Sequence, residues 1–409
     1  MKRSFALTTV SLVIALIFLI SCENDYPDSL WDPNYNSKPT PVITSIDPAD
    51  FTFSGISVIT LTGQNFSPNT SENRVFFNGR PGTVLSASAT QLQVKVPVLI
   101  ADNITIAVRV DGAYLYGYFS PYRMINAAVT YKMVDAFVNG FAVEVDKDER
   151  IYFLDAASRN IARIAHPESA LTVYGEAGAP LTCTGMRFGP DGALYHLRNN
   201  RTLYRIPAGG GPRVVNTNLF ANNVSDLDFA PSGALFAGGT GGTLFSVDLT
   251  NMTVQTVADY SGYRIVALRV YNGDLYVAAF WAGTGDPTSF SEGIWKHAIL
   301  ADNTLGPRQD VFNWKGLVGA DGRAILTMTF DADGILYVGS DKGVAITMVD
   351  LAAGTTQPLY SEILVPPASY MVWGPGKFIY VNRRSSDPEQ RNFVRIETTK
   401  FGAPYYGRQ

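Results

Sequence analysis

The chain has 409 residues, with 32 basic and 36 acidic side chains and a formal net charge of -4. This near balance gives no electrostatic reason to expect a polyanion, and no nucleic-acid partner is predicted. The length suits two domains, and frequent aromatic, Gly and Pro residues without sustained helical periodicity beyond the N-terminus indicate an all-β protein.

The first 21 residues have the features of an export signal. Lys2 and Arg3 precede an apolar run over residues 5–20, which is too short and too close to the N-terminus to be interpreted first as a membrane span. The run ends in LISC, which resembles the lipobox of bacterial lipoproteins. The resemblance implies that residues 1–21 are removed and that Cys22 becomes an acylated first residue. The alternative is an ordinary secretory signal with an incidental cysteine.

Residues 22–39 are predicted to form an extended tether, because ENDYPDSLWDPNYNSKP is polar and interrupted by proline. Glu23, Asp25 and Asp28 follow Cys22 closely. They resemble the acidic signal that directs lipoproteins of the Bacteroidetes to the outer face of the outer membrane, although any solvated linker can carry such acids. The expected location is therefore the outer membrane, lipid-anchored and facing the extracellular side.

Residues 40–126 contain short alternating segments separated by turn residues, a pattern typical of an antiparallel sandwich. The expected strands cover residues 42–46, 58–62, 74–77, 83–87, 92–96, 104–110 and 114–118. The sequences PVITSIDP, ITLTGQNFS, NRVFFNG and SATQLQVKVP resemble, in that order, the IPT/TIG family of immunoglobulin-like domains. In that family the module is commonly a spacer or contact domain without chemistry.

Residues 127–409 carry six copies of a hairpin pattern whose clearest example is GFAVEVDKDERIYFLD at residues 140–155. An aromatic residue anchors each copy at intervals of about forty residues, with one interval of about sixty, and such a period is typical of a β-propeller. The anchors are Tyr152, Tyr195, Phe236, Tyr276, Tyr337 and Tyr380. The first copy resembles an NHL repeat, so a six-bladed NHL-like propeller is expected. Because blade six lacks a clear fourth strand, residues 130–134 are predicted to complete it and close the ring.

Four charged side chains are predicted to line the central channel. Counting back from each anchor places Glu144, Arg187, Asp228 and Arg269 at one level of the innermost strands. A metal or catalytic centre like that of the six-bladed lactonases would need carboxylates that converge on a cation, and two arginines oppose a divalent ion. A self-neutralising structural ring is the favoured interpretation. No catalytic residue, metal site or cofactor is predicted.

The long interval marks the candidate ligand site. The fourth copy has about twenty extra residues, and part of them lengthens the connection between its second and third strands, on a face where propeller ligands usually bind. The candidate binding residues there are Trp281, Asp286, Phe290, Glu292 and Trp295, which would offer rings to sugar faces and polar groups to hydroxyls. The sixth copy adds Arg383, Arg384 and Arg391 in another long loop. The competing interpretations are tryptophans that cap the blade core and arginines in a solvated charge run.

The whole pattern resembles accessory proteins that are encoded with nutrient-uptake systems of the Bacteroidetes. The resemblance implies a non-catalytic surface lipoprotein that binds a glycan or peptide beside a TonB-dependent transporter and its lid lipoprotein, of the SusC/SusD type. Two alternatives remain. One is a structural subunit of the transporter complex without its own ligand, and the other is a propeller enzyme of lactonase or lyase type.

Overall fold

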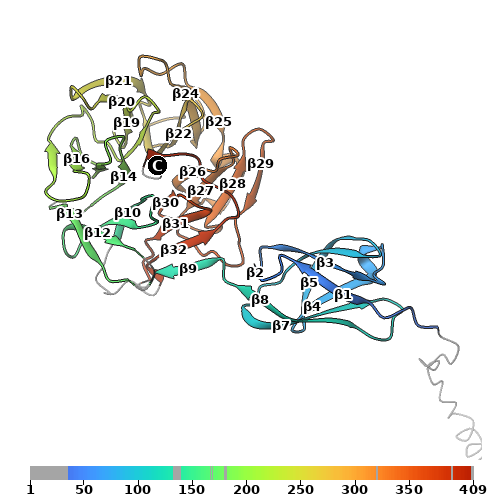
Figure 1. Cartoon of the computed structure of the whole chain (residues 1–409). Coiled ribbons are helices and arrows are strands. Elements are labelled where there is room, and N and C mark those ends of the chain that lie inside the picture. The colour runs from blue at the N-terminus through green and yellow to red at the C-terminus, as the bar shows by residue number, and fades with distance from the viewer. Residues whose placement is uncertain are drawn as a thin grey trace, which may run out of the picture.

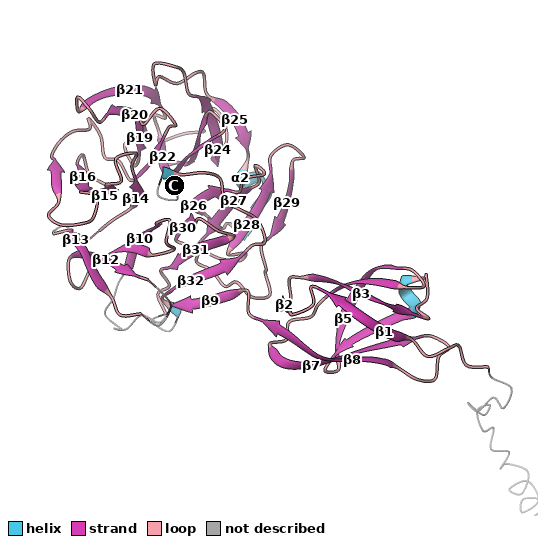
Figure 2. Cartoon of the chain, viewed as in Figure 1, coloured by secondary structure: helices cyan, strands magenta, loops and turns pink. Residues whose placement is uncertain are grey.

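The computed structural model describes residues 36–131, 140–165, 167, 169–178, 182–318, 321–387 and 390–406. Within these residues the regular structure is almost entirely β-strand, arranged as one sandwich followed by a ring of six sheets (Figure 1). The exceptions are two short helices, η1 (Thr70–Glu72) and α2 (Trp314–Val318) (Figure 2). The predicted fold class, an immunoglobulin-like sandwich followed by a six-bladed propeller, is confirmed.

No helix in the described part of the chain is both long enough and apolar enough to span a bilayer.

The sandwich is a strongly curved sheet whose eight strands run in the order β1-β3-β6-β5-β4-β7-β8-β2. Its strands are β1 (Val42–Asp47), β2 (Phe51–Phe53), β3 (Val58–Gln64), β4 (Asn73–Phe77), β5 (Arg80–Ala87), β6 (Gln91–Lys95), β7 (Ala101–Val110) and β8 (Gly117–Ile125). Alternate side chains point into one core, as Ile59 and Leu61 do from β3. The sequence prediction missed β2. It also placed the last strand too early, because residues 111–116 form the turn before β8.

Each blade of the propeller is an antiparallel sheet of four strands, with its first strand innermost (Figure 1). The first strands are β10 (Gly140–Val145), β14 (Gly185–Phe188), β18 (Asp226–Phe229), β22 (Tyr263–Tyr271), β26 (Ile325–Phe330) and β30 (Tyr370–Trp373). The second strands are β11 (Ile151–Asp155), β15 (Leu194–Leu197), β19 (Leu235–Gly238), β23 (Asp274–Trp281), β27 (Leu336–Ser340) and β31 (Phe378–Arg383).

The outer half of each blade consists of its third and fourth strands. The third strands are β12 (Asn160–Ile164), β16 (Leu203–Ile206), β20 (Thr243–Asp248), β24 (Glu292–Ala298), β28 (Ile346–Asp350) and β32 (Asn392–Glu397). The fourth strands of blades one to five are β13 (Thr172–Glu176), β17 (Val214–Asn216), β21 (Thr253–Asp259), β25 (Gln309–Phe312) and β29 (Thr355–Pro358).

Blade six receives its fourth strand from the start of the propeller. Strand β9 (Ala128–Tyr131) pairs antiparallel with β32, with Thr130 opposite Val394 and Tyr131 opposite Phe393. The predicted ring closure is therefore confirmed for Thr130 and Tyr131, although the strand begins two residues earlier than expected. The remainder of the predicted segment, residues 132–134, lies outside the described residues.

In blades one and five the anchor aromatic is held by the turn between the first and second strands. The Tyr152 hydroxyl donates to Asp146 Oδ2 at 2.8 Å, and Asp146 Oδ1 accepts the backbone N–H groups of Asp148 and Arg150 at 3.0 Å each. Blade five repeats this bond with Tyr337 and Asp331 at 3.3 Å. One carboxylate thus fixes the turn and the aromatic ring together.

The last described residues cross the end of the ring on the side of these turns (Figure 1). The backbone N–H of Ala403 donates to the Phe330 carbonyl at 3.1 Å, in blade five. The Tyr406 hydroxyl donates to the Ala230 and Pro231 carbonyls at 2.9 Å, in blade three. This C-terminal segment therefore links blades that are not neighbours.

His196 makes the stability of the propeller depend on pH. Its ring is fully buried in β15, stacks on Tyr204 at 4.9 Å, and has no hydrogen-bond partner among the described residues. Burial, with a smaller effect of Arg198 and Arg213, lowers the pKa of His196 well below its usual value. In the unfolded chain the same imidazole takes up a proton near pH 6.5. The contribution of His196 to folding stability should therefore fall as the pH drops below about 6.5, by at most about 1.4 kcal/mol for each pH unit.

The measurement is the free energy of unfolding between pH 7.5 and pH 5 for the parent and for His196→Phe, which keeps a ring on Tyr204 but cannot titrate. We expect the variant to show a smaller loss of stability on acidification. Equal pH dependence in the two proteins would contradict the assignment.

Candidate functional site

The predicted channel residues lie close together in the structure, and Arg187 is at their centre. Its Nη1 is 3.7 Å from Glu144 Oε2, and its Nε is 3.7 Å from Asp228 Oδ1. All three side chains are more than nine-tenths buried. Arg269 belongs to a second pair, because its Nη1 lies 3.0 Å from Asp226 Oδ2.

The two aspartates of β18 also bond to the next blade. Asp226 Oδ2 accepts the backbone N–H of Leu268 at 2.9 Å, and Asp228 Oδ2 accepts that of Val270 at 2.8 Å. Burial raises the pKa of Asp228, although Arg187, Arg269 and the backbone donors act in the opposite direction. The sequence analysis missed Asp226, which a further step of two residues along the strand would have placed on the same side as Asp228.

The channel geometry does not suit a substrate or a divalent cation. Guanidinium and amide groups already occupy the carboxylate oxygens that a cation would need. The cavity beside Asp226 and Arg187 measures only about 20 Å³, which is space for about one water molecule. In the described residues, no group of three or more His, Cys, Asp or Glu side chains is placed to hold a metal ion. These contacts join inner strands of neighbouring blades.

Trp295 has to be removed from the candidate ligand-binding set, because its side chain is 0% exposed. Its ring packs against Tyr260, Tyr263 and Phe290 with centroid distances of 5.9, 5.2 and 5.6 Å. Its indole N–H donates to Ser289 Oγ at 3.2 Å. Trp295 therefore belongs to the core between blades three and four, as the competing interpretation held.

Trp281 and Phe290 fold the insertion back onto its own blade. The Trp281 indole N–H donates to the Gly285 carbonyl at 2.8 Å, and its ring meets Tyr263 edge-on at 5.0 Å. A Cβ on Gly262 would lie 2.2 Å from that ring, so a glycine is required there. The Phe290 carbonyl accepts the Tyr263 hydroxyl at 3.0 Å. The insertion is thus fastened to Tyr263 of its own blade through Trp281 and Phe290 rather than held open as a platform.

The polar candidates of the insertion have different environments. Glu292 is only 9% exposed, and its Oε1 accepts the backbone N–H of Ile325 at 2.7 Å. Burial raises the pKa of Glu292. We therefore correct its assignment from ligand binding to a contact between blades four and five. Asp286 is exposed at the tip of the insertion.

The three arginines of blade six lie in different environments. The Arg384 guanidinium lies 3.8 Å from the centre of the Phe141 ring, and Arg391 Nε donates to the Ser385 carbonyl at 3.1 Å within its own loop. Burial lowers the pKa of Arg383, which lines a small cavity of about 130 Å³ between blades five and six. The structure does not bring these side chains together into one cationic site.

A larger groove, of about 770 Å³, lies on the opposite face, at the turns of blades two, three and four. Its wall is rich in carboxylate, amide and hydroxyl groups. The polar and aromatic side chains that line it are Asp191, Tyr195, Arg205, Asn216, Ser232, Ser246, Asp248, Thr250, Thr253, Gln255, Asp302, Asn303 and Tyr406. The sequence analysis did not predict this groove.

Among the residues that the structure describes, Arg205 is the one basic side chain of the groove wall. Its Nη2 donates to Asp191 Oδ2 at 2.7 Å, its Nε donates to the Tyr195 hydroxyl at 3.2 Å, and that hydroxyl donates to Asp191 Oδ2 at 3.0 Å. Although burial acts in the other direction, the bonds from Arg205, Ala193 and Tyr195 lower the pKa of Asp191. The three side chains form a fixed polar edge that remains about one-third exposed at Arg205.

Other parts of the groove come from distant segments. Ser232 Oγ donates to Asn303 Oδ1 at 2.7 Å, which connects a turn of blade three with a turn of blade four. Tyr406 adds a side chain from the C-terminal segment. A concave site of this size with many oriented donors and acceptors suits a small polar ligand or part of a chain.

Comparisons with known proteins agree with the architecture. Residues 41–123 match the IPT/TIG domain family. The N-terminal sandwich is an IPT/TIG domain. No curated protein matches the chain in sequence.

Several solved structures share the fold. A protein from Bacteroides thetaiotaomicron provisionally described as a phosphatase is 11% identical, has a TM-score of 0.54 and covers 89% of this chain and 98% of its own. A luciferin-regenerating enzyme is 14% identical, with a TM-score of 0.51 over 68% of this chain and 98% of its own. An auxiliary nutrient binding protein from Bacteroides thetaiotaomicron is 13% identical, with a TM-score of 0.49 over 90% and 99%. At these identities the likeness to the first two structures shows the fold alone.

The burial of Trp295 gives a direct prediction. Trp295→Ala should lower the free energy of unfolding by about 3 to 5 kcal/mol, because it leaves a cavity under Tyr260 and Tyr263. Asp286→Ala, at the exposed tip of the same insertion, should change it by less than about 0.5 kcal/mol. Chemical denaturation of both variants tests this. If Trp295→Ala were as stable as the parent, Trp295 would not be a core residue, and the interpretation of the insertion as an aromatic platform for a ligand would stand again.

Proposed function

We propose that this protein is a non-catalytic binding protein that holds a glycan or peptide nutrient at the cell surface. The observation that carries the proposal is the groove around Arg205, which is large enough for part of such a ligand and lined by groups that bind hydroxyls and amides. The turns that form this groove can change in sequence without disturbing the buried strands, because loops on a rigid scaffold tolerate substitution.

The channel supports a role without catalysis. In lactonase-like propellers a reaction would need open carboxylates around the axis, whereas here Arg187 and Arg269 lie against them. Among the side chains that line the groove, no His or Cys accompanies a hydroxyl group to activate it as a nucleophile. Both regions therefore favour binding over turnover.

The sequence supports the cellular part of the proposal. The LISC ending before Cys22 and the acidic residues that follow it fit a lipoprotein exported to the outer face of the outer membrane. A protein anchored there could pass its ligand to a TonB-dependent transporter and its lid lipoprotein. The IPT/TIG domain would serve as a spacer that lifts the propeller from the membrane.

Arg205→Ala tests the groove. A glycan and peptide array would first identify a ligand for the parent, and calorimetry would then compare dissociation constants. Loss of a charged hydrogen-bond donor should weaken binding by about tenfold to a hundredfold. Lys296→Ala is the matched control, since Lys296 lies opposite the anchor Tyr276 just as Arg205 lies opposite Tyr195, but outside the groove.

Other results would support other functions. Absence of any array ligand together with co-purification of a transporter would favour a structural subunit. Turnover of a lactone or glycan that disappears in Glu144→Gln or Asp228→Asn would establish an enzyme.

Cys22→Ser tests the anchor. The parent should partition with the membrane fraction and take up labelled fatty acid, whereas the variant should do neither, because the thiol that carries the diacyl group is absent. Equal membrane association of both proteins, without incorporated label, would show that the cysteine is incidental.

A further inference from the structure

The outer surface of the IPT/TIG domain carries an ordered set of side chains on strands β4, β7 and β8. Arg74 lies opposite Arg109, Phe76 lies opposite Ala107, and Ala107 lies opposite Tyr118. The residues that alternate with them, among them Val75, Ile106 and Val108, point into the core. We call the set formed by Arg74, Phe76, Ala107, Arg109 and Tyr118, together with Tyr116 from the turn directly before β8, the aromatic face.

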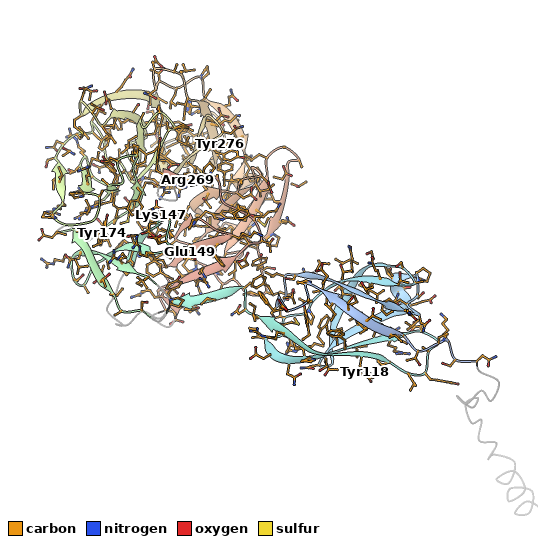
Figure 3. The ribbon with its side chains drawn as sticks, viewed as in Figure 1. Tyr118, Lys147, Glu149, Tyr174, Arg269 and Tyr276 are labelled. Carbon is orange, nitrogen blue, oxygen red and sulfur yellow. The ribbon has the colours of Figure 1, made fainter. Side chains whose placement is uncertain are left out.

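The two tyrosine rings of the aromatic face are exposed, the Phe76 ring is half-buried, and the three rings lie close to one another. Tyr118 is 63% exposed and Tyr116 is 38% exposed, and Tyr118 lies on the outside of the sandwich (Figure 3). The two rings are 6.2 Å apart and within 23° of parallel, and Phe76 is 6.5 Å from Tyr116. The small Ala107 at the centre keeps the surface between the rings low. The result is a shallow platform in which the two tyrosine rings are nearly parallel and the Phe76 ring is tilted by 50° to Tyr116.

The positive and negative charges beside the rings do not cancel. Asp111 is shared by both arginines, at 3.6 Å from Arg74 and 3.8 Å from Arg109, and such long exposed contacts contribute little. The neighbouring pairs Lys38 with Glu72 and Arg123 with Asp102 are balanced, at 3.0 and 3.2 Å. The aromatic face therefore has one positive charge in excess, carried by guanidinium groups that can bind carboxylates in bidentate geometry.

A saccharide fits this surface better than a protein partner does. A protein hot spot needs a desolvated apolar centre within a large interface, whereas here three rings stand among charged and hydroxyl groups. Thr105 and Ser120, whose hydroxyls lie 3.4 Å apart, continue the same sheet surface beyond the rings. Flat rings suit the apolar faces of sugar units, and the hydroxyls and guanidinium groups suit their polar edges.

We propose that the aromatic face of the IPT/TIG domain binds an oligosaccharide that carries carboxylate groups, with its sugar rings on Tyr116 and Tyr118 and its carboxylates at Arg74 and Arg109. The inference rests on the proposed function in so far as the protein meets glycans at the cell surface. It does not depend on the groove of the propeller. The domain then acts as a binding module as well as a spacer.

The test uses the whole chain in mild detergent and two probes, a long oligogalacturonate and a maltooligosaccharide of equal length, with dissociation constants from calorimetry. We expect tighter binding of the oligogalacturonate, weakened by added salt. Tyr118→Ala should weaken it by about tenfold. Arg109→Gln should weaken binding of the acidic probe more than binding of the neutral probe, because only the acidic probe loses a carboxylate contact. Tyr114→Ala is the control, since Tyr114 is 61% exposed but lies outside the aromatic face.

Several outcomes would overturn the inference. These are equal binding of the two probes, equal effects of Tyr118→Ala and Tyr114→Ala, or no binding of either probe. Loss of oligogalacturonate binding in Arg205→Ala but not in Tyr118→Ala would place the glycan in the groove, which overturns this inference and supports the proposed function. Loss of oligogalacturonate binding in Tyr118→Ala alone would support this inference and count against the groove as the binding site of this glycan.

Discussion

The pairing of β9 with β32 is the interaction on which the propeller depends. Each blade has two apolar faces that only its neighbours can cover, so a ring with an open joint would expose two of them to water. Four residue pairs from Ala128 to Tyr131 close the joint. Tyr131 is almost fully buried and meets the Tyr380 ring at 6.4 Å, so the closing strand contributes core contacts as well as backbone bonds.

Closure also determines where function can be added. In a closed propeller the side chains of the strands make contacts between neighbouring blades. Even charged side chains do so, since Asp226 and Glu292 each accept a backbone N–H of the next blade. The longest insertion follows the same rule, since its rings cover the core of blade four. Concave and polar surface remains at the short turns, where the groove lies, and on the outer face of the sandwich.

Much of the fold could be predicted because strands have a period of two and the anchor aromatic marks each hairpin. That regularity located Arg187 beside Glu144 and Asp228, and it showed that blade six needed a strand from the start of the propeller. The period could not show that the Trp295 side chain is buried. Both sides of a blade strand face apolar neighbours, so alternation along the strand does not distinguish buried positions from exposed ones. The groove was beyond prediction, because it joins Arg205, Asn303 and Tyr406 from three distant parts of the chain.

The position of β9 in the chain has a consequence for biogenesis. The IPT/TIG strands are complete at Ile125, so this domain can fold as soon as it emerges. Strand β9 follows within two residues, yet its partner β32 is made only after five further blades. Contacts so distant in sequence form slowly, and an unpaired strand edge is prone to associate with other chains. Strand β9 therefore stays unpaired through most of the synthesis of the chain. Loss of β32 by a late truncation should then be more harmful than its size suggests, because β9 would have no partner.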